Sequence, residues 1–294
     1  MLYSFIYLLK CIYLYDFYFC DHNKSLDLDV SETQIYFYDF VNNVNISNKI
    51  EGTAELLKST VDLDSKRRLI IFVPGFKSNI NKDLEEVVRQ TFKDVPDVYL
   101  IIVDHSAYTY EDKERLKSYL RSVRYSYYIG HILGKVLANL SRDTFPPDNI
   151  HFIGHSLGGH IISYAAETFR DITKDRVWRI TGLDPAGPCF SVGRLEDQIR
   201  SGVGKYVEVY HCNAGHFGTT QTIADTDFFF NREGKVQPDC DEGTILNLFA
   251  YNNVRLLYIT FINVNIFVAN APPQRKPIGG FLLHFGQTRN NLPM

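Results

Sequence analysis

The sequence lacks the features that mark a metalloprotein or a nucleic-acid-binding protein. Its five cysteines are an odd number, and no Cys-x-x-Cys pair of the kind found in structural zinc sites occurs. Lysine and arginine total 31 against 34 aspartates and glutamates, so the formal net charge is −3. A protein that binds nucleic acid needs an excess of positive charge to neutralise phosphates. We therefore expect no metal site and no nucleic-acid partner.

Long apolar runs are also missing. A membrane-spanning helix needs about 20 consecutive apolar residues, whereas the run Leu256 to Ala269 is shorter and contains asparagine. Residues 1–20 are apolar and aromatic, but Lys10 interrupts them and Asp16 follows, unlike the charge order of a signal peptide. We predict no transmembrane segment. Residues 1–25 form either a signal peptide or an irregular N-terminal segment.

Short apolar runs alternate with amphipathic helical patterns up to Cys240. The apolar runs cover residues 34–41, 69–73, 98–103, 149–153, 177–183 and 205–210. The helical patterns cover residues 84–92, 111–140 and 160–169. This alternation is typical of an α/β protein with a mostly parallel central sheet and helices on both faces. We predict one domain over residues 26–240 and an atypical tail of uncertain fold over residues 241–294.

The segment Gly154-His155-Ser156-Leu157-Gly158 matches the G-x-S-x-G pattern and lies between an apolar run and a helical pattern. In this pattern the serine occupies a strained turn, and the flanking glycines let the strand and helix backbones pass closely. The hydroxyl then lies at a helix N-terminus, where backbone N–H groups favour a developing oxyanion. The pattern predicts Ser156 as a nucleophile, the alternative being an ordinary glycine-rich turn.

A serine nucleophile needs a base, an orienting carboxylate and donors for the oxyanion. Asp184 ends the run 177–183 and follows Ser156 in the order that this fold uses, although an aspartate before proline is also a turn former. The N–H of Leu157, directly after the serine, is one expected oxyanion donor. The loop Pro74-Gly75-Phe76 ends an earlier apolar run, and the Phe76 N–H is the natural second donor.

Several segments resemble the animal pancreatic-lipase family, which includes triacylglycerol lipases, phospholipases A1 and related insect proteins. They are VPGF (73–76), GHSLGGH (154–160), RITGLDPAGPCF (179–190), VEVYHCNAG (207–215) and TDFFFNREGKVQPDC (226–240). The resemblance implies an α/β-hydrolase fold, with Ser156 as nucleophile, Asp184 as the acid of the triad, and the Phe76 and Leu157 N–H groups as the oxyanion hole. It also implies a lipid ester as substrate, a lipid–water interface as partner, secretion, and neither metal nor organic cofactor. The short stretch from Asn213 to Asp227 resembles the phospholipase A1 type more than the triacylglycerol lipase type.

The sequence departs from this family after Cys240. The family places a second cysteine there, followed by the Ser-His of the catalytic histidine, but no cysteine follows Cys240 and His284 is the only histidine beyond His216. The motif contexts of His155, His160, His211 and His216 favour structural roles. The catalytic base therefore stays unidentified, with His284 as the late candidate.

Two interpretations of this departure stay open. The chain is either a lipid-binding or yolk-type storage protein that has lost its base, or residues 241–294 do not represent the authentic C-terminus. The second interpretation is favoured by a tail rich in Asn, Ile, Phe, Leu and Tyr, as translated A/T-rich non-coding DNA would be. It is also favoured by the retention of Ser156 and Asp184. The sequence does not indicate an oligomeric state.

Overall fold

The computed structural model describes residues 20–234 and folds them around one sheet of eight strands in the order β2-β1-β4-β3-β5-β6-β7-β8. The strands are β1 (Gln34–Asp39), β2 (Val44–Lys49), β3 (Arg68–Val73), β4 (Val98–Asp104), β5 (Ile150–His155), β6 (Arg179–Leu183), β7 (Tyr206–His211) and β8 (Thr226–Phe229). From β4 to β8 all neighbouring strands are parallel, whereas β1 pairs antiparallel with both β2 and β4. The prediction of a mostly parallel sheet is confirmed.

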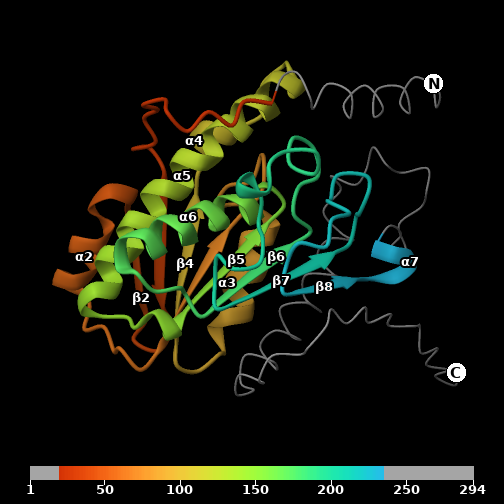
Figure 1. The fold of residues 1–294 in the computed structure, drawn as a ribbon. Helices are drawn as coiled ribbons and strands as arrows, with labels where there is room; N and C mark the ends of the chain where they lie inside the picture. The colour runs from red at the N-terminus through yellow and green to blue at the C-terminus, as the bar shows by residue number, and fades with distance from the viewer. Residues whose placement is uncertain (1–19, 235–294) are drawn as a thin grey trace, which may run out of the picture.

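Helices cover both faces of the sheet, as expected for an α/β-hydrolase. The α-helices are α2 (Thr53–Thr60), α3 (Asp83–Lys93), α4 (Ser106–Thr109), α5 (Arg115–Asp143), α6 (Leu157–Thr173) and α7 (Asn231–Gly234). Figure 1 shows α5 and α6 side by side on one face. Leu69 and Ile71 of β3 join the core on that face, while Ile70 joins the second core, which α3 covers with Val88. Side chains that alternate along a strand point to opposite faces, so β3 is buried on both sides.

Some element boundaries differ from the sequence prediction for local reasons. The helix expected from residue 111 begins at Arg115, because Asp112 accepts the Glu114 N–H and the Ser118 hydroxyl and so closes a turn before the helix. The expected strand 34–41 ends at Asp39, whose Oδ1 accepts the Val41 N–H. Strand β2 was not predicted, because its sequence VNISNK is polar and the strand is exposed at the sheet edge.

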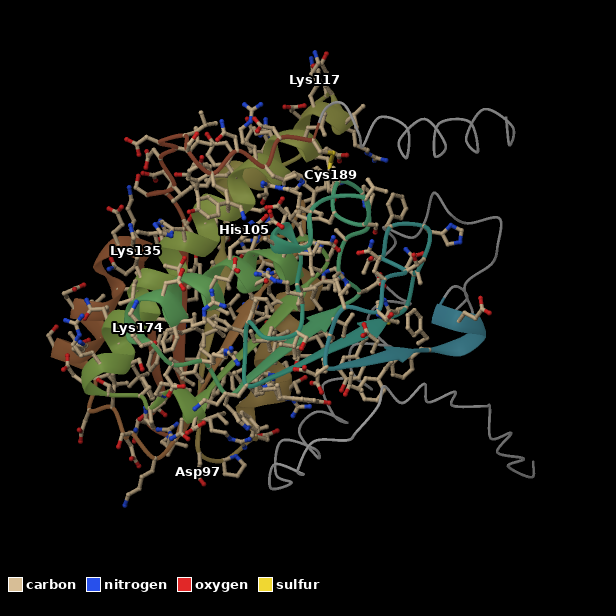
Figure 2. All side chains as sticks on the ribbon, viewed as in Figure 1. Asp97, His105, Lys117, Lys135, Lys174 and Cys189 are labelled. Carbon is tan, nitrogen blue, oxygen red and sulfur yellow. A yellow bond between two sulfur atoms is a disulfide. The ribbon has the colours of Figure 1, made fainter. Side chains whose placement is uncertain are left out.

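The N-terminal segment from residue 20 to residue 26 is attached to the domain. A disulfide joins Cys20 to Cys189, with 5.5 Å between the Cα atoms. Lys24 forms an ion pair with buried Asp197 at 2.9 Å. Figure 2 shows Cys189 on the same side of the molecule as Lys117, near the first turns of α5. The described part of segment 1–25 therefore packs with the domain predicted from residue 26.

Other predictions fall on residues that the structure does not describe. Residues 1–19 and 235–294 lie outside the described range. They include the rest of segment 1–25, the end of the predicted 26–240 domain, the whole 241–294 tail and His284. No helix within residues 20–234 is both long enough and apolar enough to cross a membrane.

Candidate active site

Ser156 occupies the turn between β5 and α6 in a strained backbone conformation. Its φ is 51° and its ψ is −117°, outside the regions that residues with a Cβ ordinarily adopt. The turn is held by the Ser156 N–H, which donates to Leu183 O at 3.0 Å. Ser156 O in turn accepts the N–H of Gly159 at 3.0 Å and of Ala186 at 3.2 Å. These bonds connect the turn to the segment that follows β6.

The glycines of the G-x-S-x-G pattern are required by close backbone contacts. A Cβ on Gly154 would lie 2.4 Å from Gly158 O, and a Cβ on Gly158 would lie 2.1 Å from Val73 O. Real Cβ atoms do not approach a carbonyl oxygen this closely, so strand β5, helix α6 and the end of β3 can meet only if both positions lack a side chain. This agrees with the reason expected from the sequence.

Asp184 lies directly after β6 and is fixed by the end of the next strand. Its N–H donates to Tyr210 O at 2.8 Å, and its Oδ1 accepts the N–H groups of Cys212 and Asn213, each at 2.9 Å. Its φ of 46° is positive, which again indicates a constrained turn. A Cβ on Gly218 would lie 2.4 Å from Asp184 Oδ1, so the loop after β7 closes over this carboxylate.

The carboxylate of Asp184 has one oxygen without a partner in the described part of the chain. Both hydrogen bonds that it accepts fall on Oδ1, and within residues 20–234 no group donates to Oδ2. Burial raises the pKa of Asp184, while the Cys212 and Asn213 N–H groups and the nearby His211 oppose that shift. Oδ2 is therefore the atom through which Asp184 can act on another group.

The loop that follows β3 lies against Ser156. A Cβ placed on Gly75 would be 3.0 Å from Ser156 Cβ, which brings the backbone of Gly75 and Phe76 beside the serine. Beneath this loop, His105 Nε2 donates to Pro74 O at 3.0 Å, and the Lys77 N–H donates to Thr109 O at 3.0 Å. The loop is thus anchored to the segment that follows β4.

Two backbone N–H groups beside Ser156 have no acceptor in the described part of the chain. Within residues 20–234, neither the Phe76 N–H nor the Leu157 N–H donates a hydrogen bond to the protein. Leu157 is the first residue of α6, where N–H groups have no partner inside the helix. Both residues adjoin the serine turn, Leu157 in sequence and Phe76 through its contact at Gly75. These two N–H groups are therefore the candidate donors to a negatively charged oxygen bound beside Ser156.

Among the four histidines near the predicted site, the side chains of His160 and His211 have structural partners, and burial affects the pKa of His155 and His160. His160 contacts Ala186 O through Nε2 at 2.9 Å and stacks on Phe190 with ring centroids 3.7 Å apart. His211 contacts Thr219 O and Asp227 Oδ1, both at 2.9 Å. Burial lowers the pKa of His155 to about 4 and that of His160 to about 3. His216 lies in the loop after β7, and its N–H donates to Asn213 O at 3.1 Å.

No imidazole within residues 20–234 bonds to Ser156 Oγ or to Asp184 Oδ2. The structure thus brings Ser156, Asp184, Phe76 and Leu157 to one end of the sheet without a base among the described histidines. His284 lies outside these residues. Within the same range, no group of three or more His, Cys, Asp or Glu side chains is arranged to hold a metal ion.

Sequence reasoning did not identify the residues that support this site. His105 follows β4 and is fully buried beneath the loop of Pro74. Figure 2 shows it well separated from Asp97, which precedes the same strand. The sequence signal for His105 was its place at the end of an apolar run. The Cys212 and Asn213 N–H groups left no signal, because backbone donors are common to every residue except proline.

Comparisons with known proteins place the chain in a family. The family described as Lipase matches residues 19–266. Phospholipase A1 VesT1.02 of Vespa tropica is 30% identical over 216 residues, which are 72% of this chain and 71% of that protein. Pancreatic lipase-related protein 2 of Myocastor coypus is 32% identical over 240 residues, which are 78% of this chain and 48% of that protein. The chain therefore spans about half the length of the second relative.

Among solved structures, α/β hydrolase domain-containing protein 10 from mouse is similar with a TM-score of 0.37 and 15% identity, covering 71% of this chain and 93% of that one. The resemblance to the pancreatic-lipase family is confirmed by the family match and by the relatives of both types. The chain belongs to the Lipase family.

Proposed function

We propose that this protein hydrolyses carboxylic esters of lipids, with the Ser156 hydroxyl as the nucleophile. The observation that carries the proposal is the strained turn of Ser156, with φ of 51° and ψ of −117°, at the N-terminus of α6. Strain of this kind persists where the surrounding structure imposes it, and it is concentrated at functional sites. Membership of the Lipase family supports the same reaction.

The N–H groups of Phe76 and Leu157 would give the reaction its electrostatic support. When Ser156 Oγ attacks an ester carbonyl, negative charge develops on the carbonyl oxygen. The N–H groups of Phe76 and Leu157 would donate to that oxygen, because neither has another acceptor within residues 20–234. A donor of this kind lowers the activation barrier by about 2.7–4 kcal/mol.

Asp184 would orient the base. Its Oδ1 is occupied by the N–H groups of Cys212 and Asn213, which leaves Oδ2 to accept an imidazole N–H. The histidine would take the proton of Ser156 and later give it to the leaving alcohol, while Asp184 stabilises the imidazolium. In this sequence the histidine outside the described residues is His284, and it is the candidate that we propose to test as this base.

The substrate proposal is an ester of a phospholipid or an acylglycerol. Relatives named phospholipase A1 and pancreatic lipase-related protein 2 support both classes. The short connection between β7 and β8, residues 212–225, favours the phospholipid. Secretion is proposed with it, because the Cys20–Cys189 disulfide is of a kind that persists in oxidising compartments.

Labelling of the full 294-residue chain with a fluorophosphonate tests the nucleophile. We expect labelling in the wild-type chain, loss of labelling in Ser156→Ala, and retained labelling in Ser201→Ala, a matched change at an exposed serine. The variant His284→Ala then tests the base, and we expect it to label at least 10³-fold more slowly. Hydrolysis of phosphatidylcholine and of triacylglycerol, measured separately, assigns the substrate class.

Absence of labelling in a folded wild-type chain would contradict the proposal. If that chain bound phosphatidylcholine vesicles without hydrolysing them, the lipid-binding alternative would replace it. Labelling that persists in His284→Ala would instead leave the nucleophile in place and remove His284 as the base.

A further inference from the structure

A buried carboxyl group lies behind the loop that carries Phe76. Glu85 is in the first turn of α3 and its side chain is 0% exposed. Its Oε1 accepts the hydroxyl of Ser78, which belongs to the β3–α3 loop, residues 74–82. Its Oε2 is buried and has no hydrogen-bond partner in the described part of the chain. A buried charged oxygen without a donor is unfavourable.

The charged groups around Glu85 do not neutralise it. Asp104, at the end of β4, faces Glu85 and repels its negative charge. Both oxygens of Asp104 are occupied, since they accept the N–H groups of Ile80 and Ser106, each at 2.9 Å. Arg89 on α3 is the nearby cation, but its guanidinium donates to Glu86 and to Ile80 O.

We infer that Glu85 is a positioning residue of the β3–α3 loop: its carboxyl group fastens Ser78 to α3, and ionisation of that carboxyl favours opening of the contact. The inference about catalysis rests on the proposed function, because the loop carries the Phe76 N–H. The contact itself does not depend on catalysis. Ser78 is only two positions beyond Phe76, so a displacement of Ser78 moves the proposed oxyanion donor.

The sign of the effect follows from linkage between proton binding and stability. The pKa of Glu85 is raised from 4.5 to about 7, mainly by burial and to a smaller extent by Asp104, while the Ser78 hydrogen bond opposes the rise. The Ser78 hydrogen bond favours the ionised carboxyl, but the cost of burying the charge is larger, so the closed contact binds the proton more tightly than an open one. The stabilisation that the closed contact gains from the protonated carboxyl is fully present at pH values below 4.5, the ordinary pKa of Glu85. It falls as the pH rises toward 7 and is lost above pH 7.

Urea unfolding of the full chain at pH values from 5 to 8 tests the linkage. Relative to Glu85→Gln, the unfolding equilibrium constant of the wild type should rise by about 70-fold over this range. The control is Glu86→Gln, an exposed change on the next residue of α3. Hydrogen bonds from Gln90 and Arg89 lower the pKa of Glu86, so Glu86 does not titrate in the same window. A wild-type to Glu85→Gln ratio that stays constant with pH would overturn the inference.

Hydrogen exchange of the β3–α3 loop separates positioning from a purely structural role. After correction for intrinsic rates, the loop should lose protection between pH 6 and pH 8 in the wild type and keep it in Glu85→Gln. Ser78→Ala should lose protection already at pH 6, whereas Ser78→Thr, which retains the hydroxyl, should not. Equal loop protection in Ser78→Ala and the wild type would overturn the inference even if Glu85→Gln failed to fold.

These measurements are independent of the proposed function. If the chain is not labelled by fluorophosphonate but shows the pH-linked loop opening, the proposed esterase function is rejected and the proposed role of Glu85 is retained. If the chain is labelled, the wild-type labelling rate should fall above pH 7 relative to that of Glu85→Gln. An identical pH profile in the two proteins, together with equal loop protection, would refute the positioning role.

Discussion

At the scale of single residues, the site depends on positions where the backbone leaves ordinary conformations. Ser156 and Asp184 both have positive φ values, 51° and 46°. Each such residue costs about 1–3 kcal/mol, which surrounding contacts must offset. The offset here comes from hydrogen bonds between neighbouring segments, such as Ser156 N–H to Leu183 O and Asp184 N–H to Tyr210 O.

Gly158→Ala is expected to destabilise the serine turn. The new Cβ would meet Val73 O at 2.1 Å, so β3 and α6 would have to separate. We expect a loss of about 1–3 kcal/mol in the free energy of unfolding, measured by urea titration. Gly159→Ala is the matched control, because its Cβ would lie 3.3 Å from Pro185 Cβ, a contact that a small shift relieves. Equal effects of the two changes would contradict this account.

Asp184→Asn is expected to retain the structure of the turn after β6 and to lose the ability to orient the catalytic base. Its remaining oxygen can still accept from Cys212 and Asn213, but the amide would present a donor where Oδ2 now lies. If Asp184 orients the base, the rate of fluorophosphonate labelling should fall by about 10⁴. Circular dichroism and the urea midpoint check that folding is retained. A rate within tenfold of the wild type would exclude Asp184 from the triad.

At the scale of elements, β6 and β7 are joined by a buried ion pair as well as by their ladder. Arg179 and Glu208 lie 2.6 Å apart and are 3% and 2% exposed. Thr181 also donates to Glu208 Oε1 at 2.7 Å. Strand β6 leads to Asp184, and strand β7 leads to the N–H groups of Cys212 and Asn213 that bind its carboxylate. The ion pair therefore helps to hold these two segments next to each other.

Glu208→Gln should be strongly destabilising because it leaves the Arg179 charge buried without its partner. The expected loss is about 3–5 kcal/mol in urea unfolding. The double variant Arg179→Met with Glu208→Leu should recover most of it, since no charge then stays buried. Asp148→Asn, which breaks an exposed pair with Lys205, should cost no more than about 1 kcal/mol. Similar losses for the single and double variants would contradict the argument.

The elements themselves show where sequence patterns suffice. Apolar runs identified the buried parallel strands, because a strand covered on both faces must be apolar along its whole length. The edge strands β2 and β8, the helix α2 and the delayed start of α5 were missed. The pairing of β2 with β1 and the turn around Asp112 depend on hydrogen bonds that hydrophobic periodicity does not record.

At the scale of the whole molecule, one disulfide connects the N-terminal segment to the loop after Asp184. Cys20 and Cys189 are 169 residues apart in sequence. His22 reinforces the connection through its Nε2 contact with Cys189 O at 2.9 Å. A crosslink that closes so long a loop reduces the conformational entropy of the unfolded chain.

Removal of this disulfide should lower stability without changing the fold. Cys20→Ser is expected to cost about 2–5 kcal/mol, measured by urea unfolding under oxidising conditions. Dithiothreitol should reduce the wild-type value toward that of the variant and leave the variant nearly unchanged. The matched control is Cys212→Ser, which does not touch the disulfide. A wild-type midpoint that is insensitive to the reductant would contradict the prediction.

The sequence alone determined the α/β class, the buried strands, and the identity of Ser156 and Asp184 as the site candidates. These are local properties, because periodicity and the G-x-S-x-G turn are encoded by adjacent residues. Tertiary structure decided which atoms meet: Oδ1 of Asp184 with two backbone N–H groups, His105 beneath Pro74, and Glu85 behind Ser78. Such contacts join residues from different strands and helices, and only the order and packing of those elements bring them together.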